Sequence, residues 1–564
     1  MDPASVALQY HDATKHHFNR FARSLGYLDW ATQPEPFRRY ANAPLVELPR
    51  APLATDVPYD ALFASPGSKA YPIDLHSIGE FLRCSMGLSA WKQYGSSRWA
   101  LRVNPSSGNL HPTETYIVWE GRVCHYAVRE HALEERCVFD APAWDQPAFL
   151  VALTSIHWRE AWKYGVRAFR YCQHDAGHAI GALRLAAALL GWHLTLLPRW
   201  SDAQLATLLG TGRDGDFAAA EPEEPECIAI VSAADTRPWV DLDPSPFVTA
   251  ARAAPWHGVA NQLSPDRVPW PIIDEVAEAT RYPGIPRCEG AIVRGATAPL
   301  AQTVAPSHPR TTAPSHHRIV APLDARSTIL QRRSAVAFDA RSTLPREAFL
   351  SMLRRLQPRP ALASAKAAAP PWDAIDWPPH VHLALFVHRV QDVVPGVYAY
   401  LRDPSVLEEW RGTMNPSFLW ERMNDPNDPN DPNDPNDPNV GLFLLVPIDC
   451  RRPANRVSCD QDIAEDGFFS LAMLARLEAP LREQGAWMYR RVFWESGLIG
   501  QVLYLEAEAA GARATGIGCF YDDPVHEMLG LTGHAWQSLY HFSMGVPVED
   551  TRLTTEPGYP WESP

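Results

Sequence analysis

Three short segments, far apart in the chain, combine the groups needed to hold a phosphorylated planar ligand. Residues 104–112 read Asn-Pro-Ser-Ser-Gly-Asn-Leu-His-Pro and supply hydroxyls, an amide and turn-forming Pro and Gly. Residues 331–334, Gln-Arg-Arg-Ser, supply a hydroxyl and two guanidinium groups, which match phosphate oxygens bidentately. Residues 515–518, Thr-Gly-Ile-Gly, permit close backbone approach to a flat ring. Since neither half of the chain holds all three, we expect one site built across two halves.

Each segment also has a plainer interpretation when it is taken alone. The 105–109 stretch has the composition of an ordinary turn, and adjacent arginines are commonly solvated. The 515–518 segment lacks the Gly-x-Gly-x-x-Gly dinucleotide fingerprint, so a simple bend is its alternative. His174 and His178 have a spacing that can chelate a metal, but no third ligand is evident. We expect core or capping histidines there, and no metal.

An imperfect internal repeat predicts two related domains. Asp175-Ala-Gly matches Glu495-Ser-Gly at an offset of 320, whereas Tyr126 and its surroundings match Tyr400 at an offset of 274. The second copy therefore carries an insertion, and residues 424–439 iterate Asn-Asp-Pro, which cannot continue a helix or a strand. We expect a surface loop there. The predicted domains are residues 1–240 and 325–564, joined by a Pro/Ala-rich linker at 241–324.

Apolar periodicity predicts an α+β architecture, with sheets covered by helices. Two long helices should end at Gly191 and Gly511, and a further helix is expected over residues 463–474. Apolar, partly β-branched runs predict buried strands at 115–119, 149–154, 227–232, 382–387 and 440–446.

Composition limits the partners and the compartment. A formal net charge of −14 disfavours nucleic acid and anionic membranes, which reward a basic face. Nine cysteines are scattered without a paired motif and are expected to be reduced thiols. The N-terminus lacks the features of a signal peptide, and no stretch reaches the roughly 18–20 apolar residues of a membrane span. We expect a cytoplasmic protein.

In combination these segments resemble the nitroreductase family, and within it the azoline-dehydrogenase (SagB-type) branch in a tandem form. The resemblance covers nearly the whole chain except the linker and the Asn-Asp-Pro tract. It implies two tandem nitroreductase-like domains that form an intramolecular pseudo-dimer with FMN at their interface. It is carried by motifs at residues 10–15, 26–30, 104–112, 516–524 and 546–552.

The resemblance also implies roles for individual residues. Lys163 and Tyr164 align with the Lys-Tyr pair that transfers a proton in azoline dehydrogenases, and a surface lysine beside a packing tyrosine is the alternative. Arg552 would be a second phosphate ligand, and Asp460 and Gln461 would contact the ring edge. The implied FMN-binding set is Pro105, Ser106, Ser107, Asn109, Arg332, Arg333, Ser334, Asp460, Gln461, Gly516, Ile517, Gly518 and Arg552.

Departures from the family pattern predict a single site. The first half lacks an Arg-Arg-Ser segment near 65–69 and has Gly-Trp-His-Leu at 191–194 in place of the glycine segment. The second half has a Pro- and Trp-rich stretch at 370–379 in place of the Pro-Ser-Ser turn. We expect one FMN per chain in a monomeric pseudo-dimer that transfers a hydride to or from a small-molecule or peptide-borne substrate. Azoline-to-azole oxidation, NAD(P)H-dependent nitro or quinone reduction, and flavin binding without catalysis all stay open.

Overall fold

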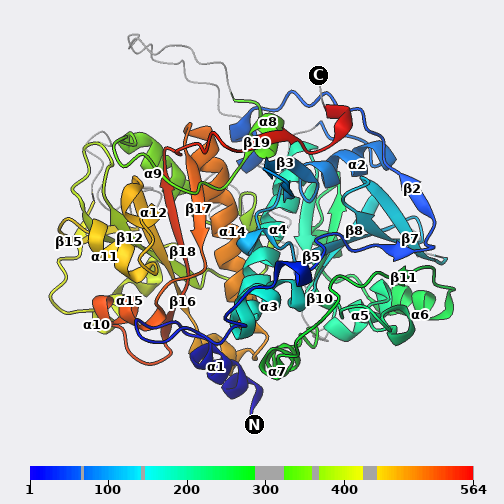
Figure 1. The fold of residues 1–564 in the computed structure, drawn as a ribbon, viewed down its shortest axis with the longest axis horizontal. Helices are drawn as coiled ribbons and strands as arrows, with labels where there is room; N and C mark the ends of the chain where they lie inside the picture. The colour runs from blue at the N-terminus through cyan, green and yellow to red at the C-terminus, as the bar shows by residue number, and fades with distance from the viewer. Residues whose placement is uncertain (65–68, 141–145, 286–322, 359–367, 424–440, 563–564) are drawn as a thin grey trace, which may run out of the picture.

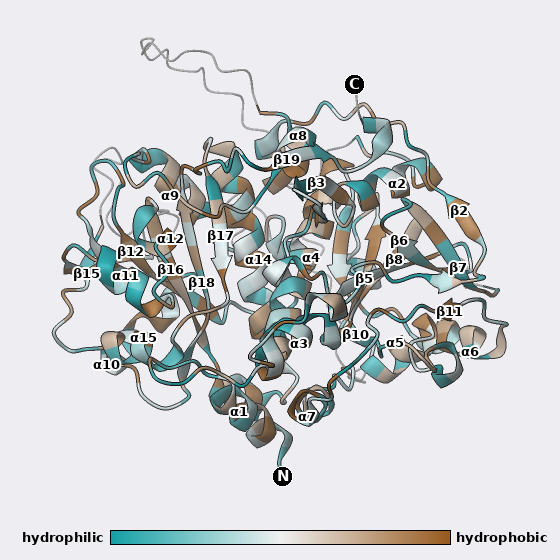
Figure 2. Ribbon diagram, in the orientation of Figure 1, coloured by the Kyte–Doolittle hydropathy of each residue, from teal (hydrophilic) through white to brown (hydrophobic). Residues whose placement is uncertain are grey.

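Two seven-stranded sheets stand on either side of a central pair of long helices in the computed structural model of the chain (Figure 1). The structure describes residues 1–64, 69–140, 146–285, 323–358, 368–423 and 441–562, so the Asn-Asp-Pro tract lies outside the described residues. Apolar residues run along the central strands of both sheets (Figure 2), where β8 and β12 are buried along their whole length. Within the described ranges, every helix is too short or too polar to cross a bilayer.

The two sheets share one connection pattern. The strand orders are β2-β7-β6-β5-β8-β10-β9 and β14-β15-β13-β12-β16-β18-β17. If the edge strands β2 and β14 are set aside, the remaining six strands of each sheet follow the same path: the first, second and third strands along the chain take the same positions in both sheets, and so do the fourth, fifth and sixth. The edge strands differ, because β2 precedes its six strands in the chain whereas β14 lies between the second and the third of its six. The repeat seen in the sequence therefore corresponds to a repeated sheet topology.

The first sheet contains β2 (Leu45–Glu47), β5 (Thr113–Trp119), β6 (Arg122–Ala127), β7 (Ala132–Val138), β8 (Ala148–Ser155), β9 (His193–Leu196) and β10 (Glu224–Ser232). The second contains β12 (Val381–Val387), β13 (Gly396–Tyr400), β14 (Glu421–Arg422), β15 (Leu442–Pro447), β16 (Phe469–Arg476), β17 (Arg513–Ile517) and β18 (Trp536–Gly545). Two smaller sheets pair β1 (Tyr40–Ala41) with β11 (Val259–Ala260), and β3 (Leu88–Tyr94) with β4 (Ser97–Arg102) and β19 (Thr554–Pro557).

Helices α4 (Ala168–Leu189) and α14 (Met488–Ala509) cross at the centre of the molecule (Figure 1). Each has 22 residues, and the two lie 320 positions apart, the offset of the sequence repeat. Their backbones touch at two glycines. A Cβ at Gly177 would clash with the carbonyl oxygen of Trp494, and one at Gly497 would come within 2.8 Å of the Gly177 Cα. Only residues without a side chain allow helices to approach so closely.

Buried ion pairs join the halves in both directions. From α14, Arg490 Nη2 lies 2.7 Å from a carboxylate oxygen of Glu226 in the first half. From the first half, Arg167 and Arg170 reach the Asp522 carboxylate at 2.9 Å and 2.7 Å. Breaking one partner of such a pair is costly because a buried charge is left uncompensated.

Each end of the chain packs on the opposite half. The N-terminal helix α1 (Pro3–Ala13) places the ring nitrogens of His11 3.2 Å from Tyr489 Oη and 3.0 Å from Gln537 Oε1. At the C-terminus β19 pairs with β3, and the Tyr559 hydroxyl donates to the Val128 carbonyl at 2.7 Å. The two halves are therefore interlocked as well as packed together.

The remaining helices lie around this framework. They are α2 (Leu75–Arg83), α3 (His157–Tyr164), α5 (Asp202–Leu209), α6 (Ser245–Ala253), α7 (Pro271–Ala279), α8 (Ala325–Gln331), α9 (Arg346–Arg355), α10 (Leu407–Thr413), α11 (Arg451–Val457), α12 (Ile463–Asp466), α13 (Glu478–Glu483) and α15 (Asp522–Leu529).

The structure confirms most predicted elements and corrects one. The five predicted strands are β5, β8, β10, β12 and β15, and both long helices end at glycines with positive φ. The predicted helix over 463–474 is wrong, because only α12 is helical and β16 follows it. Since β16 is buried on both faces between β12 and β18, its apolar residues do not alternate with polar ones.

The predicted linker contains ordered elements. Residues 241–285 include α6, β11 and α7, and Phe247, Ala251 and Ile273 on the two helices belong to buried apolar clusters. Residues 286–322 lie outside the described part of the chain. The domain boundaries stay a prediction.

The contact between α4 and α14 should be sensitive to a single methyl group. We expect Gly177→Ala to lower the free energy of unfolding by about 1–3 kcal/mol or more, because the backbones must separate to admit the Cβ. The measurement is denaturant-induced unfolding followed by circular dichroism. Gly412→Ala is the matched control, since its Cβ meets nothing within 4 Å in α10. Equal midpoints for the two variants would contradict the prediction.

Candidate cofactor site

A cavity of about 320 Å³ lies where the two halves meet. Its volume is in the range of small-molecule sites. One wall comes from the end of β4 and the turn that follows it in the first half, and the other from the 332–334 segment, α14, β17 and β18 of the second. The residues that line it include Lys92, Trp99, Arg102, Asn104, Pro105, Ser106, Ser107, Gly108, Asn109, His111, His178, Arg332, Arg333, Ser334, Tyr504, Thr515, Gly516 and Tyr540.

The turn after β4 is held in place from α4. The backbone N–H and the hydroxyl of Ser107 both donate to the Asp175 carboxylate at 3.0 Å. Gly108 and Asn109 both have φ near +60°, a conformation suited to these residue types. The Asn109 amide donates to the Ala100 carbonyl at 2.9 Å, which fixes the turn against β4.

Two arginines, one buried and one half-buried, face the turn from the second half. Arg332 follows α8 and donates from Nε to the Val103 carbonyl at 3.1 Å, and Arg333 donates from Nη2 to the Ser89 carbonyl at 2.8 Å. Their other hydrogen-bond acceptors are also backbone carbonyls, and among the described residues Arg332 Nη1 and Arg333 Nε have no acceptor. Burial, and then the neighbouring Arg332 charge, lower the pKa of Arg333 to about 10.

The cavity has no acidic residue in the described lining, although Lys92, Arg102, Arg332 and Arg333 all contribute to it. Buried cations without carboxylate partners are unfavourable unless a ligand compensates them. The lining also contains Asn104, whose Oδ1 is buried without a hydrogen-bond partner among the described residues. Both features suit a ligand that carries an anionic group and polar hydrogen-bonding groups.

The glycine segment lies at the edge of the cavity. Gly516 lines it, and a Cβ at this position would overlap the hydroxyl of Tyr540. The Gly516 N–H donates to the Tyr504 hydroxyl at 2.9 Å within the chain itself. Ile517 packs into a small apolar cluster, and Gly518 lies against the ring of Tyr171, so neither lines the cavity.

Lys163 and Tyr164, at the end of α3, reach the turn without lining the cavity. A Cβ on Gly108 would lie 2.5 Å from Tyr164 Oη and 3.1 Å from Lys163 Nζ. Burial, and then the nearby Glu160, raise the pKa of Tyr164 well above its usual value. Glu160 is itself buried, and both its carboxylate oxygens lack hydrogen-bond partners within the described chain. Burial raises the pKa of Glu160 well above its usual value, which favours the protonated form.

Besides Ile517 and Gly518, three more residues of the expected set do not line the cavity. Arg552 is exposed and its guanidinium pairs with Asp550 at 2.7 Å. Asp460 is exposed and pairs with Arg456 at 2.7 Å, whereas the Gln461 amide donates to the carbonyl of Cys519 at 2.9 Å.

Other lining residues were not predicted as site residues. Lys92, Tyr504 and Tyr540 have no local motif, and long-range packing alone brings them to the cavity. His178 was noticed for its spacing from His174, but it faces the cavity and burial lowers its pKa to about 3. Within the described ranges, no cluster of three or more His, Cys, Asp or Glu side chains could hold a metal.

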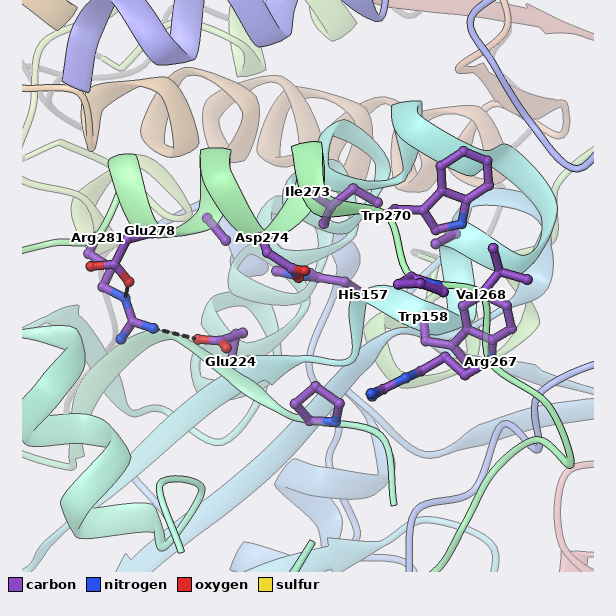
Figure 3. Close-up of a pocket in the computed structure, with 14 residues that line it drawn as sticks. His157, Trp158, Glu224, Arg267, Val268, Trp270, Ile273, Asp274, Glu278 and Arg281 are labelled. Atoms are coloured by element: carbon purple, nitrogen blue, oxygen red, sulfur yellow. Dashed lines mark hydrogen bonds and ion pairs between the residues drawn. The ribbon is translucent and has the colours of Figure 1, made fainter. Parts of the chain in front are cut away.

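A second cavity, of about 470 Å³, is enclosed by α3, α7 and β10 (Figure 3). Trp158 and Trp270 form an aromatic wall, and Arg281 lies 2.5 Å from Glu278 and 3.6 Å from Glu224. Because these charges already compensate one another, this cavity does not call for an ionic ligand as the first one does.

Comparisons with known proteins agree with this geometry. Residues 72–219 match the model of the nitroreductase family. A solved chain from Anabaena variabilis, assigned as a nitroreductase, is 20% identical with a TM-score of 0.64, over 96% of this chain and 99% of that one. At this identity the likeness shows the fold alone. No curated protein matches the chain.

Two further solved structures overlap too little to support an argument. A Ralstonia eutropha chain assigned as a nitroreductase is 15% identical with a TM-score of 0.27, over 36% of this chain and 98% of that one. The E. coli microcin synthetase McbBCD complex with truncated pro-MccB17 is 14% identical with a TM-score of 0.28, over 44% and 79%. The chain thus carries a nitroreductase-family domain in a mixed α+β, nitroreductase-like fold.

The acid that holds the turn should make stability depend on pH. Burial raises the pKa of Asp175 from 3.8 to about 7, so the folded state binds a proton that the unfolded chain has lost. The contribution of Asp175 to the free energy of unfolding should therefore fall by about 1.4 kcal/mol per unit as the pH rises from about 4 to 7. Asp175→Asn should flatten this dependence in unfolding curves at several pH values. An unchanged slope would contradict the assignment.

Proposed function

We propose that the chain is an FMN-dependent oxidoreductase with one flavin site between its two nitroreductase-like halves. The observation that carries the proposal is the pair of buried Arg332 and half-buried Arg333, which line a cavity whose described lining includes no carboxylate. A phosphate would supply the missing negative charge, and guanidinium groups bind it bidentately. The match of residues 72–219 to the nitroreductase family supports a flavin as the phosphorylated group.

The remaining lining residues fit the rest of that ligand. Ser334 and the hydroxyls of the 105–109 turn would bind its polyol chain, and Asn104 Oδ1 would find a donor there. At the cavity edge, Gly516 and the Tyr540 side chain that packs against it would contact the flat ring. When bound, FMN supplies the chemistry of hydride transfer.

Lys163 and Tyr164 are proposed as the proton-transfer pair. Both abut the turn at Gly108, where they can contact a substrate bound beside the turn. Burial raises the pKa values of the neighbouring Tyr164 and Glu160, and the Lys163 amine is proposed as the group that accepts or returns the proton. Asp175 holds the turn through Ser107 and would thereby fix the position of the cavity wall relative to Lys163 and Tyr164.

The proposal of one site per chain is supported by the residue that takes the place of Tyr504 in the first copy of the repeat. Tyr504 lines the cavity, and the residue 320 positions earlier, Arg184, instead forms a bidentate ion pair with Asp373 at 2.8 Å and 2.7 Å. Asp373 belongs to the stretch that replaces the Pro-Ser-Ser turn. The cation there is already neutralised by the chain itself, so it has no need of a phosphate.

Azoline oxidation and NAD(P)H-dependent nitro or quinone reduction both use such a site, and one experiment separates them. Anaerobic mixing with NADH or NADPH should bleach the flavin if the chain is a reductase of that kind. A thiazoline-containing peptide should bleach it if the chain is an azoline dehydrogenase. If neither donor changes the spectrum, the non-catalytic alternative is favoured.

FMN retention should depend on Arg333. Arg333→Ala removes a charge-assisted phosphate contact of about 1.5–3 kcal/mol, so the dissociation constant should rise roughly tenfold to hundredfold. The measurement is fluorescence of released flavin together with the FMN-to-protein ratio, which should be near one in the unmodified protein. Arg552→Ala is the matched control, because its guanidinium is exposed and paired with Asp550. A ratio near two, or equal losses in both variants, would count against the proposed site.

Turnover should depend on Lys163 without a change in FMN content. Lys163→Ala should lower the rate with the active donor by about 10²-fold or more, the scale of one positioned acid–base group. Lys69→Ala, at an exposed lysine, should leave both quantities unchanged. Wild-type turnover in Lys163→Ala protein with full FMN content would remove Lys163 from the mechanism.

A further inference from the structure

Two cysteines from distant parts of the second half are in contact beside the cavity wall. The Sγ atoms of Cys459 and Cys519 lie 3.0 Å apart. Cys459 follows α11, and Cys519 directly follows Gly518 at the end of β17. Both are half-buried, whereas the other described cysteines, Cys84, Cys124, Cys137, Cys172, Cys227 and Cys450, are buried.

The surroundings make the two thiols unequal. The hydrogen bond with Cys459, the hydrogen bond with His16 and the positive charge of Arg167 all lower the pKa of the Cys519 thiol. The same contact and burial raise the pKa of Cys459. Cys519 therefore loses its proton more readily than Cys459 does. An accessible thiolate next to a second thiol is the arrangement of a reactive cysteine with a resolving partner.

A structural role as metal ligands does not account for the pair. Among the described residues, these two thiols do not belong to any set of three or more possible ligands. Neither thiol is needed by the proposed flavin site, because neither cysteine lines the cavity.

We propose that Cys459 and Cys519 form a redox-active dithiol that hydroperoxides oxidise to a disulfide. The Cys519 thiolate attacks the terminal oxygen of the hydroperoxide, an S–O bond forms, the O–O bond breaks, and the leaving alkoxide or hydroxide takes a proton from water. Cys459 then attacks the resulting sulfenic acid, and its proton leaves with the displaced hydroxyl as water. The two cysteines lose two electrons and the hydroperoxide gains them.

The geometry favours closure over intermolecular reaction. A disulfide has an S–S length of about 2.05 Å, so the two sulfur atoms must approach by only about 1 Å. The Arg167 guanidinium donates to the Gly518 carbonyl at 3.2 Å, which positions the backbone next to Cys519. A small-molecule dithiol would return the pair to its reduced state by exchange.

The test is oxidation of the full-length protein with hydrogen peroxide, followed by blocking of free thiols and peptide mass spectrometry. We expect a cross-linked peptide joining Cys459 to Cys519, lost after treatment with dithiothreitol, while the buried Cys172 in the same sample keeps its thiol. Intermolecular links, or oxidation spread evenly over the cysteines, would overturn the proposal.

Single variants assign the two roles. Cys459→Ser should accumulate a sulfenic acid at Cys519, trapped by a 1,3-diketone reagent. Cys519→Ser should slow peroxide-dependent loss of the Cys459 thiol roughly tenfold or more, because a thiol would have to react in place of a thiolate. Equal rates in the two variants would refute the assignment. Circular dichroism checks that each variant is folded, and the readout requires no bound flavin, so the result is independent of the proposed function.

Discussion

The close contact between α4 and α14 is the constraint on which the rest of the structure depends. Gly177 and Gly497 let the two backbones meet, and neither position tolerates a side chain without moving a helix. From this crossing each helix faces the sheet of its own half and the residues of the other (Figure 1). The interface is a shared core, because apolar residues from both helices and both halves form one continuous cluster.

The site follows from that crossing because α4 holds the turn that forms one wall, whereas α14 contributes to the other wall. Asp175 on α4 holds the turn of the first half, and Tyr504 on α14 contacts the 332–334 segment, where the Ser334 and Tyr504 hydroxyls lie 3.0 Å apart. A displacement of one helix along the other would therefore separate the turn from the arginines. The cavity exists only as long as the two glycines keep the helices in register.

The two copies differ at positions that the repeat makes equivalent. Glu495, the counterpart of Asp175, also accepts backbone N–H bonds, from His380 and Val381, but it has a buried Arg402 partner that Asp175 lacks. Arg402 compensates the charge of buried Glu495, whereas burial raises the pKa of Asp175 to about 7. Charge pairing thus distinguishes the two copies at this pair of equivalent positions.

The sequence by itself determined the repeat, the buried strands and the two long helices, because periodicity and end signals are local properties of the chain. It also identified the turn at 105–109 and Arg332 and Arg333 as residues that belong together. Only the tertiary structure decided that β16 is a strand, that Arg552 is paired on the surface, and that Lys92, His178 and Tyr540 reach the cavity. The contact of Cys459 with Cys519 joins residues that are 60 positions apart. These contacts and pairings depend on which residues from distant parts of the chain bury one another and which charges they bring together. A local sequence pattern does not contain that information.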